Sequence, residues 1–426
     1  MIDIKQIRET PQRFKDACKA KGFEVDIDRL LDVYGKVVGA KTELQQILTK
    51  KNRIGKSIPK LSGQDKESAL SQLAELKTTE AQHNETIKKL EPQFDELMLQ
   101  VAQPADDDVP FGEDDTENVE IRREGEVRQF DFEPKDHVQL GLDLGIIDIE
   151  RAVRLAGTRN YILKGDGALL HWAVLRFAMD SMVAKGYVPF SVPVLMKDET
   201  MTGTGFFPGS EDQTYRMEKD ELNLAGTAEV PLTAYRMGEI LKADELPLKY
   251  VGLSSCFRRE AGAAGKDTYG LYRIHQFDKV EQVVICENSV EQSNKFHDEI
   301  LANAEAVMQA LELPYRVANV CTGDLGRGQA KKFDIEAWMP SRGNYCETHS
   351  ASKFYEFQAR RMNLRYRDPA TKKNLFCHTL NNTVIASPRI LIPILELYQN
   401  SDGSITIPKV LRPYMDDKEL IVRREA

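Results

Sequence analysis

The sequence has no run of about 18 apolar residues, the length that a helix needs to cross a bilayer. It also has no C-x-x-C pair among its six cysteines, so neither a structural zinc site nor a disulfide framework is indicated. The first ten residues, MIDIKQIRET, are polar and include acids, unlike a signal or transit peptide. These absences predict a cytoplasmic protein with reduced thiols and no membrane partner.

An excess of positive charge is also missing. The formal net charge is −9, so no overall basic field attracts nucleic acid, and any such contact needs a local basic patch. With 426 residues, 41% hydrophobic and 29% charged, the chain has the composition of a globular protein. It is long enough for two or three domains, each able to bury a core.

A periodic segment over about residues 27–101 predicts two antiparallel helices. Mostly apolar residues recur at alternating spacings of three and four over residues 30–61, and a second series of this kind runs over residues 73–101. A turn signal at residues 62–65 separates the two series. A short turn forces neighbouring helices to lie antiparallel. The N-terminal part is therefore expected to be an antiparallel coiled-coil hairpin, preceded by one short helix and a connector over residues 1–26.

Two local features of this hairpin stand out. Pro92 lies inside the second helix and is expected to kink or interrupt it. Between residues 44 and 64 there is no acid. The basic residues of that stretch are Lys50, Lys51, Arg53, Lys56 and Lys60. They form either a solvated helix face or a contact surface for an RNA backbone, and the acidity of the rest of the chain favours RNA.

The segment at residues 104–110, with two prolines and three aspartates, is typical of a linker. It predicts an N-terminal domain over residues 1–108 and a second domain over residues 109–426. In the second domain an apolar face over about residues 168–185 predicts a helix that Gly186 ends.

Short β-branched and aromatic segments follow, with glycine-rich loops between them. These segments are residues 187–195, 249–258, 271–286, 315–321 and 333–339. Their pattern predicts an α+β fold, in which an antiparallel sheet is flanked by helices, rather than a doubly wound fold.

The most informative stretch consists of two strand-like runs, residues 250–260 and 270–286, joined by a loop that contains glycine. If the second run is a strand, Arg273 and Phe277 share one face, because strand side chains alternate. Together with Arg258, this surface offers forked contacts to phosphate and a flat ring for a base. Taken singly, such arginines are more often surface salt bridges, so the pattern alone leaves both interpretations open.

The order of several motifs adds a resemblance to these patterns. FRRE (257–260) and RIHQFDKVEQ (273–282) closely resemble motif 2 of class II aminoacyl-tRNA synthetases in its seryl-tRNA synthetase form, and GYVPFSVPVL (186–195) resembles motif 1. Further segments match that family in the same order: TAEVPL (227–232), CTGDLG (321–326), FDIEAWMP (333–340), ETHS (347–350), FQARRMNLRYR (357–367) and VLRPYM (410–415). The N-terminal hairpin is also typical of this family, so the resemblance covers essentially the whole chain.

The resemblance implies a set of site residues. The catalytic residues are expected to be Arg258, Glu260 and Arg389. The serine site is expected to comprise Thr227, Ala228, Glu229, Arg258, Glu281 and Thr383. The ATP site is expected to comprise Arg258, Arg259, Glu260, Arg273, Ile274, Phe277, Glu347, Thr348, His349, Ser350 and Arg389. The implied Mg²⁺ ligands are Glu347 and Ser350, and the implied tRNA contacts are the five basic residues of the hairpin.

The family also implies roles within this set. Arg258 is expected to contact the α-phosphate of ATP and the serine carboxylate, and Arg273 the terminal phosphates. Phe277 and Arg389 are expected to hold the adenine between them. Glu281 is expected to bind the ammonium and hydroxyl of serine. The implied activity is the activation of L-serine by ATP and its transfer to the 3′ end of tRNA(Ser), and of tRNA(Sec) where one exists, by a homodimer joined through motif 1.

The sequence departs from the family in the segment NNTVIASPR (381–389). Val384 and Pro388 stand where glycine is common, which puts the approach of the backbone to the ligand in doubt. A catalytically altered paralogue that binds RNA, or a ligase that loads an amino acid on a carrier protein, therefore remains an alternative. Retention of Arg258, Glu281 and Arg389 counts against the first alternative, and the retained hairpin counts against the second.

Overall fold

The computed structural model describes residues 1–262 and 269–423, and the chain divides between Ala102 and Gln103 into two units. One unit is Ile2–Ala102, and the other is Gln103–Ala426 together with Met1. Most of the loop expected after Glu260 lies outside the described residues.

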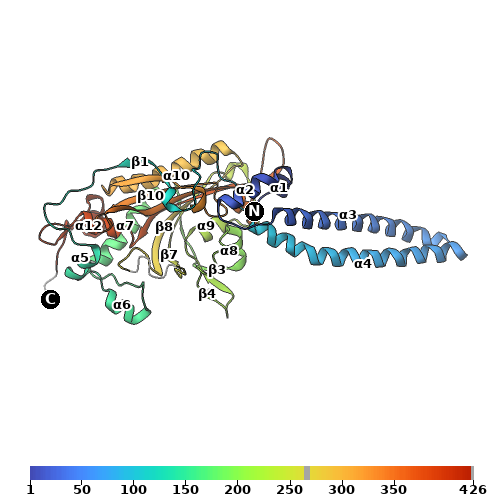
Figure 1. Cartoon of the computed structure of the whole chain (residues 1–426), viewed down its shortest axis with the longest axis horizontal. Helices are drawn as coiled ribbons and strands as arrows, with labels where there is room; N and C mark the ends of the chain where they lie inside the picture. The colour runs from blue at the N-terminus through green and yellow to red at the C-terminus, as the bar shows by residue number, and fades with distance from the viewer. Residues whose placement is uncertain (263–268, 424–426) are drawn as a thin grey trace. The chain divides into compact units, whose positions relative to one another are not determined.

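The N-terminal unit is entirely helical, and its two longest helices pack against each other as a hairpin (Figure 1). Its elements are α1 (Ile4–Glu9), α2 (Pro11–Ala20), α3 (Ile27–Ser57), the short 3₁₀ helix η1 (Ile58–Lys60) and α4 (Gly63–Gln100). The predicted hairpin is confirmed. The expectation of a single short helix before it is wrong, because two helices precede it and Thr10 separates them.

The predicted seam of the hairpin holds α3 and α4 together. Leu30, Val33 and Val37 of α3 are at most 5% exposed. The polar exception in this seam, Lys51, forms an ion pair across it with Glu80 of α4. A charge at a seam position is thus neutralised by the facing helix rather than exposed to solvent.

The helix α4 differs from expectation at two points. It begins at Gly63, so the turn is shorter than residues 62–65. It also continues through Pro92 without a break. Pro92 is exposed, so the Lys88 carbonyl, which loses its intrahelical donor, can bond to water instead.

The second unit is built on an eight-stranded sheet with the strand order β1-β9-β10-β11-β14-β8-β7-β2. In that order the strands are β1 (Val119–Glu124), β9 (Tyr315–Asn319), β10 (Lys331–Met339), β11 (Asn344–Tyr355), β14 (His378–Ser387), β8 (Gln276–Cys286), β7 (Leu248–Phe257) and β2 (Val188–Ser191). Only the β2–β7 pair in this sheet is parallel, which confirms the predicted antiparallel-dominated α+β fold. Strands β1, β11 and β14 were not predicted.

Helices and smaller sheets surround this sheet. The helices are α5 (His137–Asp143), α6 (Ile149–Ala156), α7 (Asp166–Ala184), α8 (Asp198–Thr204), α9 (Glu229–Ala234), α10 (Val290–Ala310), α11 (Phe357–Met362) and α12 (Leu391–Leu397). The remaining strands are β3 (Leu195–Lys197), β4 (Arg216–Met217), β5 (Leu222–Leu224), β6 (Ile240–Lys242), β12 (Arg365–Arg367), β13 (Asn374–Phe376), β15 (Ile405–Thr406) and β16 (Leu420–Ile421). The 3₁₀ helices are η2 (Asp115–Glu117), η3 (Ala243–Glu245), η4 (Thr322–Asp324), η5 (Pro340–Arg342) and η6 (Lys409–Met415). The helix predicted over residues 168–185 is confirmed as α7.

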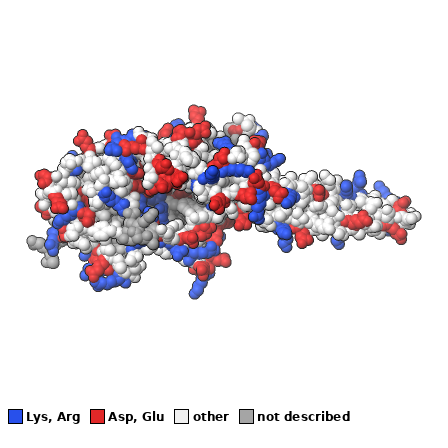
Figure 2. Space-filling view, viewed as in Figure 1, with Lys and Arg blue, Asp and Glu red and all other residues white. Residues whose placement is uncertain are grey.

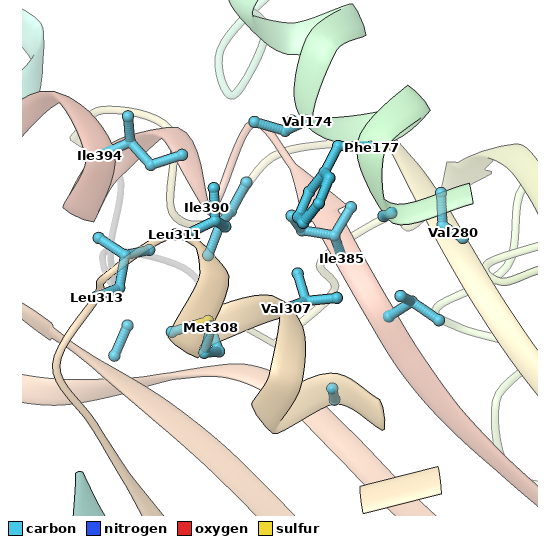
Figure 3. Close-up of a cluster of buried hydrophobic side chains, with 14 of the residues drawn as sticks. Val174, Phe177, Val280, Val307, Met308, Leu311, Leu313, Ile385, Ile390 and Ile394 are labelled. Carbon is cyan, nitrogen blue, oxygen red and sulfur yellow. The ribbon is translucent and has the colours of Figure 1, made fainter. Parts of the chain in front are cut away.

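The alternation of side chains along β8 determines which face of the sheet carries chemistry. Val280 and Val284 join the main core beneath α7 and α10, where Figure 3 shows Phe177 and Val307 among the packed side chains. Val283 lies in a different cluster, with Leu232 of α9. Because strand side chains alternate, Lys279 and Glu281 share the face of Val283, away from α7 and α10.

One predicted strand begins later than expected. The run from residue 270 is not a strand before Gln276, so the alternation expected for Arg273 does not apply. The carbonyl of Arg159 accepts the His275 N–H at 3.1 Å, and the Arg159 guanidinium donates to the Arg273 carbonyl at 3.2 Å. These bonds hold the chain ahead of β8 in a turn.

The segment over residues 104–110 is bonded to the sheet of the second unit. Asp106 pairs with the Lys353 ammonium at 2.6 Å and accepts a hydrogen bond from the Tyr355 hydroxyl at 2.9 Å. Asp108 pairs with Lys331. Since Lys353 is 2% exposed, this segment contributes counter-ions to the sheet rather than only linking two parts of the chain.

The described residues include no helix that is long and apolar enough to cross a membrane. All six cysteines are free and buried.

Candidate active site

A cavity opens on the sheet face that carries Glu281, with about 510 Å³ of empty space that includes open solvent at its mouth. Its lining residues come from β7, β8, β11, β14 and the segments that follow or precede them: Arg258, Glu260, Leu271, Tyr272, Ile274, Phe277, Lys279, Glu347, Thr348, Thr383, Ala386 and Arg389. The structure therefore brings half of the predicted serine and ATP residues, eight of sixteen, into one lining. Sequence reasoning missed Leu271, Tyr272, Lys279 and Ala386.

Strand register places the amino-acid end of the site. Glu281 of β8 lies opposite Thr383 of β14, and the Thr383 hydroxyl donates to its carboxylate at 3.4 Å. Glu281 is 2% exposed and forms an ion pair with Lys279. Lys279 also donates to the Thr227 hydroxyl at 2.7 Å. Burial lowers the pKa of Lys279 to about 8.

The segment that follows Thr227 adds a second carboxylate. Glu229 accepts a hydrogen bond from the Gln358 amide at 2.9 Å, and the Thr379 hydroxyl fixes Gln358 at 2.6 Å. Burial raises the pKa of Glu229 above its usual range. Ala228 is fully buried, so only its backbone can contribute to a ligand site.

The segment of β14 that departs from the family contains a bulge. The register between β14 and β8 shifts between Thr383 and Ile385, and Val384 is fully buried in the main core. The bulge absorbs the extra residue, so the valine side chain points away from the cavity while Thr383 still faces Glu281.

The arginines of the predicted motif 2 lie in different surroundings. Arg258 lies 5.2 Å from the centre of the Phe277 ring and lines the cavity. Arg273 pairs with Glu260 at 2.9 Å. Arg259 is exposed, does not line the cavity and donates to the Asp212 carbonyl at 3.3 Å.

Arg389 lies on a tyrosine in this structure. Its guanidinium is 4.3 Å from the centre of the Tyr272 ring and donates to the Tyr272 carbonyl at 3.2 Å. It also donates to the Glu347 carbonyl at 3.1 Å. Tyr272 thus orients the arginine that the family resemblance places at the adenine.

The two expected Mg²⁺ ligands, Glu347 and Ser350, both lie on β11. Loss of water around Glu347 acts to raise its pKa, but Arg389, Lys332 and Arg258 outweigh this and keep the pKa below its usual range. Glu347 is therefore an anion, and its side chain is 46% exposed. Ser350 of β11 lies opposite Asp334 of β10.

Asp334 was missed by sequence reasoning. It is 4% exposed, and its Oδ1 has no hydrogen-bond partner in the described part of the chain. Burial raises its pKa to about 7. Within the described ranges no group of three His, Cys, Asp or Glu residues could hold a metal ion. A carboxylate with a hydroxyl fits Mg²⁺, which accepts oxygen ligands and takes the rest from phosphates and water.

Thr348 and His349, two of the predicted ATP contacts, are buried within the protein. His349 is 1% exposed, its Nε2 lies 3.0 Å from the Val384 carbonyl, and its Nδ1 lies 2.8 Å from the Thr348 hydroxyl. Burial lowers the pKa of His349 to about 4, so its imidazole is neutral. A contact from His349 to a nucleotide would have to use its backbone.

The predicted basic stretch lies on the hairpin of the N-terminal unit. Lys50, Arg53, Lys56 and Lys60 are exposed, whereas Lys51 is occupied by Glu80. Figure 2 shows acidic side chains among the basic ones along the hairpin.

Comparison with known proteins gives a consistent result. Residues 1–103 match the profile of the seryl-tRNA synthetase N-terminal domain, and residues 213–398 match that of the class II tRNA synthetase core domain (G, H, P, S and T). The serine–tRNA ligase of Deinococcus radiodurans is 46% identical over 99% of both chains.

Two solved structures are also similar. The seryl-tRNA synthetase of Pyrococcus horikoshii, complexed with ATP, has a TM-score of 0.93 at 37% identity, over 100% of both chains. The cytoplasmic serine–tRNA ligase of Naegleria fowleri, in complex with AMP, has a TM-score of 0.86 at 30% identity, over 97% of this chain and 96% of that one.

Proposed function

The chain belongs to the seryl-tRNA synthetase family, and from that premise we propose that it activates L-serine with ATP and transfers the seryl group to the 3′ end of tRNA(Ser). Where a tRNA(Sec) exists, it is a second acceptor. The observation that carries the choice of amino acid is the buried contact between Glu281 and Thr383, of which Thr383 lines the cavity.

Glu281 and Thr383 select serine. A buried carboxylate binds the substrate ammonium, and the carboxylate and the threonine hydroxyl together bond to the serine hydroxyl. Alanine would leave these polar groups unpaired, which is costly in a buried site. Thr227, Ala228 and Glu229 form the remaining wall of this subsite.

Arg258 brings the two reactants together. It binds the serine carboxylate and the α-phosphate of ATP, while Phe277 beneath it and Arg389 hold the adenine. A carboxylate oxygen of serine attacks the α-phosphorus, and the bond to pyrophosphate breaks. No general base is required, because the nucleophile is already an anion. Catalysis then consists of positioning and neutralisation of charge.

The remaining ATP contacts belong to the same proposal. Glu260, Ile274 and the Thr348 segment would contact the nucleoside, and Arg273 would contact the terminal phosphates. Glu347 and Ser350 would hold Mg²⁺, which when bound neutralises the phosphate oxygens. In the second step a hydroxyl of the terminal adenosine of tRNA attacks the seryl carbonyl, and AMP leaves.

The two parts of the chain divide this work. Residues 1–108 act as the tRNA-binding domain, whose basic residues meet the RNA backbone, and residues 109–426 act as the catalytic domain. The enzyme works in the cytoplasm, which the six free thiols suit. It works as a homodimer joined through the edge strand β2, whose Val188 is 53% exposed in the single chain.

Amino-acid-dependent exchange of pyrophosphate into ATP, measured across all twenty amino acids, tests the activity. We expect exchange with serine alone, followed by charging of total tRNA. Exchange with no amino acid would support a paralogue that has lost catalysis. Exchange with serine but no charging of tRNA would support a ligase for another acceptor.

A further inference from the structure

Lys279 is a buried cation of the cavity that lies in the motif 2 segment but has no role in the proposed chemistry. It lies on β8, two residues before Glu281, so both side chains point to the same face. Its neighbours on the adjacent strands are Ser254 and Ala386, both small, which leaves room for the lysine side chain along the sheet. The residue is 5% exposed.

The ammonium of Lys279 contacts the groups assigned to serine. It forms an ion pair with Glu281, donates to the Thr227 hydroxyl at 2.7 Å and lies 3.5 Å from the Thr383 hydroxyl. An ammonium has three hydrogen-bond donors, and these contacts account for all three. The substrate brings an ammonium and a hydroxyl that need the same acceptors.

We infer that Lys279 is an internal competitor of the substrate, whose ammonium holds Glu281, Thr227 and Thr383 while the amino-acid subsite is empty and yields these contacts to serine. The inference rests on the proposed function. It explains how a fully enclosed carboxylate remains paired in the free enzyme, since an unpaired buried charge would be strongly destabilising.

Competition of this kind raises the cost of entry for every amino acid. Serine replaces the lost contacts with its own ammonium and hydroxyl. Alanine and glycine replace only the charge, so the Thr383 hydroxyl and part of the Glu281 carboxylate lose a partner. Because each amino acid must displace Lys279 first, its ammonium weakens the binding of serine and alanine by the same factor, and only an amino acid that replaces the lost contacts binds tightly.

The charges around Lys279 permit its displacement. Burial and the nearby Arg258 lower the pKa of Lys279 to about 8, so its charged form is less favoured than that of a lysine in water. The carboxylates that act on it are Glu281, its ion-pair partner, and Glu229 and Glu347, and the Cys256 thiol also faces it. Glu229 lies near enough to balance the displaced ammonium when the substrate ammonium takes Glu281.

The kinetic test uses the full-length Lys279→Met variant and measures exchange with serine and with alanine. We expect the KM for serine and the KM for alanine to fall by the same factor of about tenfold or more, because neither amino acid then has to displace the ammonium from Glu281. The control is Lys249→Met, which removes a partly buried lysine of β7 that is paired with Glu299. A KM for serine that stays the same or rises would overturn the inference.

A second measurement needs no variant. In a crystal structure of the unaltered protein with a sulfamoyl analogue of seryl-adenylate, Lys279 Nζ should lie more than about 4 Å from Glu281, beyond ion-pair distance. An intact Lys279–Glu281 pair beside bound serine would overturn the inference. Serine-dependent exchange by the unaltered protein would then still uphold the proposed function, so the two failures are distinguishable.

Discussion

Glu281 is the residue on which the choice of substrate depends most directly. The Glu281→Gln variant keeps the shape of the side chain and removes its charge. We expect kcat/KM for serine to fall by at least about 100-fold, because breaking a buried ion pair costs about 3 kcal/mol or more. The KM for ATP should change much less.

The matched control is Glu287→Gln, one residue beyond the end of β8 and exposed. It should exchange pyrophosphate like the unaltered protein. Equal losses in both variants would mean that the Glu281 charge does not bind serine.

His378 predicts how stability depends on pH. It is 4% exposed, and burial lowers its pKa to about 4. Below about pH 6.5 the unfolded chain binds a proton that the folded chain does not, so stability falls as the pH falls from 6.5 to 4. Between pH 7 and pH 5 this residue alone should cost about 2 kcal/mol of unfolding free energy.

Urea unfolding followed by tryptophan fluorescence measures this effect, because both tryptophans, Trp172 and Trp338, lie in the second unit. His378→Gln should lose about 2 kcal/mol less than the unaltered protein between pH 7 and pH 5. Equal losses would show that His378 is not held neutral by burial.

Functional residues could be predicted where a short motif contains them, but not where the pairing of distant strands brings them to the site. Arg258, Phe277 and Glu281 could be predicted from local segments that resemble a family. Asp334 and Tyr272 could not, since their importance arises from strands and turns that meet only in the fold. Lys279 was present in a recognised motif, but nothing local shows that its ammonium meets Thr383, about a hundred residues away.

At the scale of elements, the hairpin was the most predictable part. A heptad pattern can be recognised from neighbouring residues alone. The one charged position in the α3 seam, Lys51, pairs with Glu80 of α4. Strand boundaries were less predictable. The start of β8 depends on bonds from Arg159, a residue far away in the sequence, which no alternation pattern reveals.

The hairpin also carries a prediction. Changing its four exposed basic residues to glutamate should weaken tRNA binding, because each lost phosphate contact removes a salt-dependent contribution. The residues are Lys50, Arg53, Lys56 and Lys60. We expect kcat/KM for tRNA charging to fall by about tenfold or more, with serine-dependent exchange unchanged.

The control reverses the charge of two exposed lysines of the second unit, with the changes Lys372→Glu and Lys373→Glu. Charging by the control protein should match that of the unaltered one. Normal charging by the fourfold hairpin variant would contradict a role for this stretch in RNA binding.

The whole molecule is proposed to be a pair of chains. The edge strand β2 exposes 53% of Val188, and Leu195 beyond it is 46% exposed. Light scattering should therefore give twice the mass of one chain, and Val188→Asp should shift the protein towards monomers, because a buried charge at an interface is costly.

Val290→Asp, at a residue that is 58% exposed on α10, is the control and should leave the mass unchanged. A monomer with full charging activity would contradict the proposed assembly.

The ion pair between Asp106 and the buried Lys353 determines where the chain can be shortened without loss of stability. A shortened enzyme that starts at residue 109 would lack Asp106 and Asp108, leaving Lys353 without its carboxylate in the middle of the sheet. One that starts at Gln103 would keep both carboxylates. Asp106 and Asp108 therefore stabilise the sheet although they precede its first strand. Truncation or domain exchange at this point should succeed only when both aspartates are kept with the second unit.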